Sequence, residues 1–176
     1  MTQVSQLESR RLLLAGQGLA QGRWSLEQML EQLGFVQLDS INAVARAQEL
    51  TLHARMPDYV HESLFDLLPQ KRVFEHWTHD ASMLPAASWP FWSERFRQRG
   101  ERILQSNWWR ERMGPRAEEM LAHVLTRLGQ DGPLQSKDFS SEHKSGGGWW
   151  NWKPEKAALE YLWLSGRVSV VKRRNF

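Results

Sequence analysis

The sequence contains no cysteine among its 176 residues. Disulfide bonds, thiolate zinc sites and cysteine nucleophiles are therefore excluded, and the chain suits a reducing compartment. Lysine is scarce as well, because Lys71 is the single lysine before Lys137, which disfavours Schiff-base chemistry in the first part of the chain. No apolar run of membrane-spanning length and no signal-peptide pattern is present. We expect a soluble cytoplasmic protein.

Positive charge is concentrated, although the formal net charge is only +3. Residues 86–116 hold seven arginines against three glutamates, interleaved with tryptophan and phenylalanine, and residues 153–176 form a second basic segment. This mixture is typical of phosphate contact and base stacking, although a solvated helix face over an aromatic core has the same composition. The candidate nucleic-acid ligands of the first segment are Arg95, Arg99, Arg102, Arg110 and Arg112.

Tryptophan is unusually frequent, with ten residues in the chain. Most should pack in cores, but Trp149 and Trp150 follow three glycines in a polar segment, where a large ring could stack on a base. Lys153 lies next to them. We include these three residues among the candidate DNA contacts.

The first 85 residues contain the clearest signals of local structure. Residues 4–15 predict a helix. A second helix should begin after Ser25, whose capping box is completed by Gln28, and should stop at Gly34. A third is expected from about Ile41 to Leu52. Residues 73–77 and 81–84 then predict a hairpin, or wing, so residues 1–85 have the outline of a winged helix.

The remainder repeats this outline after a connecting basic aromatic helix, expected from about residue 89 to 104 within 86–115. Residues 116–128 and the segment from Pro154 to Leu164 predict helices, and residues 167–171 alternate like a strand. The fold class we expect is mainly α with small β wings, α+β, in tandem winged-helix modules over 1–85 and 116–176. Because the last strand has no returning partner, we expect the second wing to be truncated in this chain.

Gln37 and Asp39 form the candidate catalytic pair. In an extended segment their side chains point to one side while Val36 and Leu38 face the core, so an amide and a carboxylate could converge on one reacting atom. The alternative is that Asp39 or Ser40 caps the helix that follows. The two interpretations are compatible, because the positive end of a helix dipole would keep Asp39 ionised.

Acidic and histidine side chains also gather around the hairpin. Glu75, His76, His79 and Asp80 have metal-ligand chemistry, but His76 and His79 should point to opposite faces of the hairpin and no third ligand is evident, so we disfavour a metal. His79 could contact phosphate or line a cleft; the alternative is an ordinary surface histidine.

Several motifs occur in an order that resembles one family. They are Gln17-Gly18-Leu19, Gly34-Phe35-Val36-Gln37-Leu38-Asp39-Ser40-Ile41, His53-Ala54-Arg55, Phe74-Glu75-His76-Trp77-Thr78-His79-Asp80-Ala81-Ser82 and Trp149-Trp150-Asn151-Trp152-Lys153. The sequence resembles the YcaQ/AlkZ-type winged-helix DNA glycosylases, and the Gln37-Leu38-Asp39 version of their catalytic signature resembles the YcaQ branch. Members are typically about twice as long, so the resemblance covers an N-terminal portion.

The resemblance implies hydrolysis of the N-glycosidic bond of N7-alkylguanine and unhooking of DNA interstrand crosslinks by a monofunctional glycosylase. It implies no metal or organic cofactor, and duplex DNA carrying alkylated purines or crosslinks as partner. We expect a monomer that is associated with the nucleoid when it acts on DNA. The rival hypotheses are a non-catalytic winged-helix regulator or architectural protein, whose helix 154–164 would enter the major groove, and a protein-interaction module.

Overall fold

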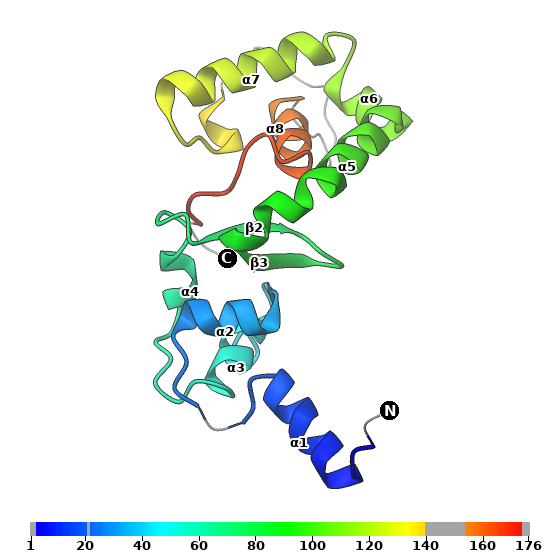
Figure 1. The fold of residues 1–176 in the computed structure, drawn as a ribbon. Helices are drawn as coiled ribbons and strands as arrows, with labels where there is room; N and C mark the ends of the chain where they lie inside the picture. The colour runs from blue at the N-terminus through cyan, green and yellow to red at the C-terminus, as the bar shows by residue number, and fades with distance from the viewer. Residues whose placement is uncertain (1–2, 21, 140–153, 174–176) are drawn as a thin grey trace. The chain divides into compact units, whose positions relative to one another are not determined.

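The computed structural model describes residues 3–20, 22–139 and 154–173. It is mainly helical with one small antiparallel sheet, so the expected α+β class is confirmed (Figure 1). The chain forms two compact units, of which the first combines Met1–Pro90 with Val170–Phe176 and the second is Phe91–Ser169. None of the described helices has the length and apolar character needed to cross a membrane.

The first unit combines short helices with the sheet. Its elements are α1 (Gln6–Gly16), α2 (Leu26–Leu33), β1 (Val36–Gln37), α3 (Ala47–His53), α4 (Ser63–Asp66), β2 (Val73–Trp77) and β3 (Ala81–Pro85). The strand order is β1-β3-β2, with both pairs antiparallel. The hairpin of β2 and β3 was predicted from the sequence, whereas β1 adds a third strand at the edge.

Local signals around α2 behave as predicted. The Ser25 hydroxyl oxygen accepts a hydrogen bond from the backbone N–H of Gln28, and Gln28 Oε1 accepts one from the backbone N–H of Ser25. Gly34 ends the helix with φ of 78°, a left-handed conformation that glycine adopts without strain. The chain is thereby turned directly into β1, which contains Gln37 and precedes Asp39.

A buried cluster unites the helices and strands of the first unit. Met29 and Leu30 of α2 and Leu52 of α3 pack with Met83 of β3, and all four side chains are fully buried. Both helices are therefore held against the sheet, and the segment between β1 and α3 is fixed at its two ends.

The predicted start of the third helix is wrong. The segment from Ser40 to Arg46 has no regular structure, and α3 begins only at Ala47. The cause lies at Asp39, whose Oδ1 accepts the Ile41 backbone N–H at 2.9 Å. This local side-chain hydrogen bond gives the backbone an alternative to the helix.

The second unit is built around α8 (Pro154–Leu164), which packs against α5 (Ser93–Gln105), α6 (Asn107–Met113) and α7 (Ala117–Asp131) (Figure 1). Two 3-10 helices complete the described elements: η2 (Ser136–Asp138) lies in this unit, whereas most of η1 (Ala86–Trp92) belongs to the first unit. The continuous helix expected from residue 89 to 104 is divided, because Pro90 lies within η1 and has no N–H for an α-helical hydrogen bond. α6 was not predicted.

The strand expected over residues 167–171 is also wrong. These residues are not in a strand, and the backbone N–H groups of Arg167 and Val168 both donate to the Leu162 carbonyl at the end of α8. Alternation alone is insufficient, because a strand needs the hydrogen bonds of a partner strand. The glycine-rich segment with Trp149, Trp150 and Lys153 lies outside the described residues.

Two glycines with positive φ provide a test of these helix ends. A Cβ at Gly166 would lie 2.5 Å from the buried Phe96 ring, whereas a Cβ at Gly34 meets open space. We expect Gly34→Ala to cost roughly 1–2 kcal/mol of stability from left-handed strain alone. Gly166→Ala should cost more, because the ring must also move. Denaturant unfolding of both variants measures the difference, and equal losses would contradict the packing described for Phe96.

Candidate active site at the edge of the sheet

β1 and the residues after it place Gln37 and Asp39 at the edge of the sheet. Gln37 pairs with Ser82 of β3, and the Leu38 N–H donates to the Ala81 carbonyl at 2.8 Å, which continues the pairing beyond the strand. Val36 and Leu38 are buried, whereas Gln37 and Asp39 are partly exposed. The alternation predicted for this segment is thus present, with the polar pair on the accessible side.

The amide of Gln37 is held by the turn of the hairpin. Its Oε1 lies 3.2 Å from His79 Nε2, and its Nε2 donates to Asp80 Oδ2 at 3.4 Å. Because a carbonyl oxygen only accepts, His79 Nε2 must carry the hydrogen in this contact. One lone pair and one N–H of the amide stay available to a water or a substrate. His79, predicted as a DNA contact, therefore has a position that orients Gln37.

The carboxylate of Asp39 does not cap a helix. Arg46 is the N-cap of α3, so the alternative role of Asp39 or Ser40 as N-cap is wrong. Asp39 Oδ1 is occupied by the Ile41 N–H, while Oδ2 accepts no hydrogen bond from the described residues. The Asp39 N–H donates at 3.0 Å to Oε1 of Gln48 on α3.

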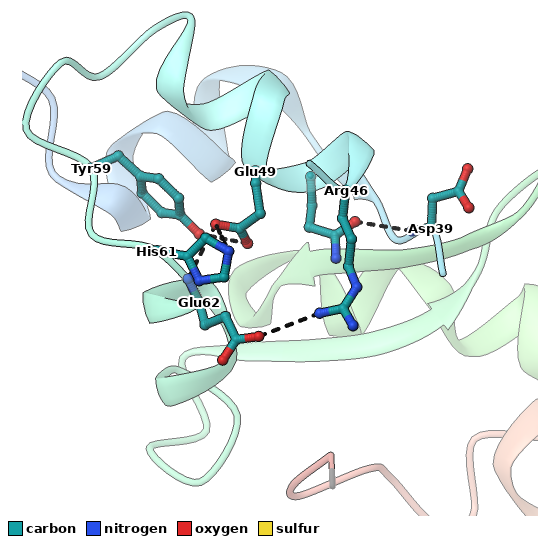
Figure 2. Close-up of polar contacts among 7 residues, drawn as sticks. Asp39, Arg46, Glu49, Tyr59, His61 and Glu62 are labelled. Atoms are coloured by element: carbon teal, nitrogen blue, oxygen red, sulfur yellow. Dashed lines mark hydrogen bonds and ion pairs between the residues drawn. The ribbon is translucent and has the colours of Figure 1, made fainter. Parts of the chain in front are cut away.

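A buried carboxylate beside this segment was missed from the sequence. Glu49 of α3 is 1% exposed, and it accepts hydrogen bonds from the Tyr59 hydroxyl at 3.2 Å and the Glu62 N–H at 3.1 Å. Burial, and then the Glu49 charge, raise the pKa of Tyr59, so this hydroxyl stays a donor. Figure 2 shows the group, with Arg46 paired to Glu62 at 3.3 Å and the Asp39 carboxylate pointing away from it.

Unlike His79 and Asp80, which contact Gln37, the two other candidate metal ligands of the hairpin, Glu75 and His76, are buried. Glu75 bonds to Arg173, whereas His79 is exposed in the turn. In the described part of the chain, no three histidine, aspartate or glutamate side chains gather as metal ligands.

Comparison with known families identifies the class of protein. The model of the AlkZ-like DNA glycosylases matches residues 30–176, which include the Gln37–Asp39 segment and the hairpin. The chain belongs to the AlkZ-like DNA glycosylase family. It is therefore a DNA repair glycosylase, as the ordered motifs indicated. No solved structure matches the chain.

In this AlkZ-like chain, three of the five predicted arginine contacts share one face of α5. Arg95, Arg99 and Arg102 are spaced by four and three residues, and burial followed by the charges of the other two lowers the pKa of Arg99. Arg97 of the same helix instead bonds to Glu94 and Glu101. Arg97 is thus paired with two carboxylates, and helical spacing places the other three arginines together on one face.

The other two arginines take part in local contacts of α6. Arg110 donates from Nε to the Leu104 carbonyl at 2.9 Å, and the Arg112 guanidinium lies 3.4 Å from the centre of the Trp108 ring. Arg112 also donates to the Trp108 carbonyl at 3.4 Å. The structure does not describe Trp149, Trp150 or Lys153, so these contacts stay predictions.

The Glu49 cluster allows a stability test. Glu49→Ala removes the carboxylate that accepts hydrogen bonds from the Tyr59 hydroxyl and the Glu62 N–H. We expect it to lower the free energy of unfolding by about 2–4 kcal/mol. Tyr59→Phe, which removes the hydroxyl and keeps the ring, should cost about 1–2 kcal/mol. Glu62→Gln is the control, because it weakens only a surface pair with Arg46 and should cost less than about 1 kcal/mol. Denaturant unfolding measures all three, and a neutral Glu49→Ala would contradict the buried network.

Proposed function

We propose that this AlkZ-like glycosylase hydrolyses the N-glycosidic bond of N7-alkylguanine in duplex DNA and unhooks interstrand crosslinks formed at guanine N7. The observation that carries the proposal is the position of Gln37 and Asp39 on the accessible side of the sheet edge, each held by neighbouring groups. It is supported by the family match, which includes both residues.

In the proposed reaction, one water is activated by two side chains with different roles. Asp39 orients the water through Oδ2, accepts its proton and stabilises the oxocarbenium-like sugar by its charge. Gln37, fixed by His79 and Asp80, holds the water with the remaining lone pair or N–H of its amide. The water oxygen bonds to C1′ while the bond from C1′ to N9 breaks.

The departing base needs no acid in this scheme. N7-alkylguanine carries a positive charge, so the electrons of the broken bond neutralise the ring and no proton has to be supplied. This differs from most sugar hydrolases, in which a second carboxyl protonates the leaving group. A crosslinked base cannot rotate into a deep pocket because it is tied to the other strand, and a pair at an open sheet edge suits such a substrate.

We also propose that the architecture is a tandem of winged-helix modules over residues 1–85 and 116–176, joined by 86–115. The support is the order of the first unit, in which α2, α3 and α4 precede the hairpin of β2 and β3, with β1 added at the edge.

The rival function is a non-catalytic winged-helix DNA binder that reads the major groove with α8. The packing of α8 argues against it, because the helix buries Ala157, Ala158, Tyr161, Leu162 and Leu164 in the core of the second unit. Few of its side chains are free to contact base edges.

Substitution of the pair tests the proposed chemistry. We expect Asp39→Asn and Gln37→Ala to lower the single-turnover rate of N7-methylguanine release by about 10²–10⁴ and 10–10³-fold, since each removes part of the water activation. Asp66→Asn, the same change at an exposed carboxylate of α4, should leave the rate unchanged. Strand scission at abasic sites measures release. A wild-type rate in folded Asp39→Asn would refute the role of Asp39, and no release by the wild type would favour the regulator.

We propose that the α5 face with Arg95, Arg99 and Arg102 contacts DNA phosphates. Arg102→Gln should reduce the slope of log K against log salt by about 0.9, the contribution of one phosphate contact. Arg97→Gln removes the same charge from a guanidinium already paired to two glutamates, so its slope should stay close to wild type. Fluorescence anisotropy with an undamaged duplex between 50 and 200 mM salt, the range over which such slopes are read, provides the comparison. Equal slopes for the two variants would contradict a contact between Arg102 on this face and a DNA phosphate.

A further inference from the structure

The backbone around Asp39 is held from two sides. The Leu38 N–H donates to the Ala81 carbonyl of β3 at 2.8 Å, and the next N–H, that of Asp39, donates to Gln48 Oε1 at 3.0 Å. The second bond crosses from the sheet edge to α3. This bond holds the backbone nitrogen of Asp39, next to the Cα atom that carries the proposed catalytic side chain.

Gln48 is an unusual residue for its position. It is fully buried, and its Nε2 has no hydrogen-bond partner among the described residues. A buried amide with an unsatisfied donor is unfavourable, and an apolar side chain of the same size would avoid that cost. Within the described part of the chain, the bond to the Asp39 N–H is the one hydrogen bond that the Gln48 side chain makes.

The position of Gln48 is itself set by the next residue. Glu49 is anchored by the Tyr59 hydroxyl and the Glu62 N–H, and it lies in the same first turn of α3 as Gln48 (Figure 2). Leu52, one turn later, is fully buried in the core. α3 is therefore anchored by a polar contact at Glu49 and an apolar one at Leu52, and Gln48 lies in the turn that begins the helix.

We propose that Gln48 is a positioning residue for Asp39, which it serves by holding the Asp39 peptide so that Oδ2 faces the attacking water. The inference rests on the proposed catalytic role of Asp39. Without this bond the peptide can rotate, and the Ile41 N–H that holds Oδ1 moves with it. A displacement of about 1 Å in a reacting group is enough to reduce a rate by about 100-fold.

Two substitutions separate positioning from simple packing. Gln48→Met keeps the size of the side chain and removes the acceptor, while Gln48→Glu keeps an acceptor oxygen and buries a charge. If Gln48 only fills space, the methionine variant is the better tolerated in both stability and activity. If Gln48 positions Asp39, stability and activity rank the two variants in opposite order.

We expect Gln48→Met to be at least as stable as Gln48→Glu and yet to release N7-methylguanine about 10–100-fold more slowly than wild type at saturating DNA, with the DNA dissociation constant unchanged. Gln48→Glu should be less stable and faster than Gln48→Met. Leu50→Met, a substitution by the same residue at an exposed position of the same helix, is the control and should keep the wild-type rate.

The double variant Asp39→Asn/Gln48→Met shows whether Gln48 acts through Asp39, because it should be no slower than Asp39→Asn alone. A wild-type rate in Gln48→Met, or a Gln48→Glu no faster than Gln48→Met, overturns the inference. When Asp39→Asn is inactive and Gln48→Met is fully active, only this inference fails. When Asp39→Asn is fully active, the proposed function fails first.

Discussion

The pairing of β1 with β3 is the constraint on which the site depends. Gln37 and His79 are 42 residues apart, and the antiparallel ladder brings them together. Because side chains alternate along a strand, a slip of one residue would bury Gln37 and Asp39 and expose Val36 and Leu38. Burial of these two apolar residues therefore fixes the register, and the register places the amide beside the hairpin turn. The pairing of β1 with β3 therefore determines both the burial of Val36 and Leu38 in the core and the position of Gln37 in the site.

Features of the fold set by neighbouring residues could be predicted from the sequence, and features set by distant partners could not. Ser25 and Gly34 mark the ends of α2 through hydrogen bonds and a backbone conformation that depend on a few adjacent residues. The start of α3 was predicted too early, because Asp39 has the chemistry of a helix cap but bonds instead to the Ile41 amide in a turn. Residues 167–171 have the alternation of a strand and lack its partner within the described residues, which no pattern along the chain reveals.

The candidate site follows the same division. The spacing of Gln37 and Asp39 was enough to predict that they lie on one side of an extended segment. The contact of Gln37 with His79 and Asp80 needs the strand register, and so was not predicted. Gln48 and Glu49 are polar residues with good helix propensity, which in a sequence are typical of an exposed helix face. Their burial appears only when α3 packs against the loop that carries Tyr59 and Glu62.

The acceptors and donors of the hairpin limit the chemistry that the pair can perform. Asp80 lies beside Gln37, but its two oxygens accept hydrogen bonds from Gln37 Nε2 and from the Ala81 N–H, so it acts there as an acceptor. His79 directs its Nε2–H to the Gln37 carbonyl. The neighbours of the pair thus orient an amide and supply no proton toward a leaving base. An arrangement of this kind favours substrates whose base already carries positive charge, because a neutral purine departs readily only when an acid protonates it. The preference for alkylated purines that we propose therefore rests on what surrounds Gln37 as much as on Asp39 itself.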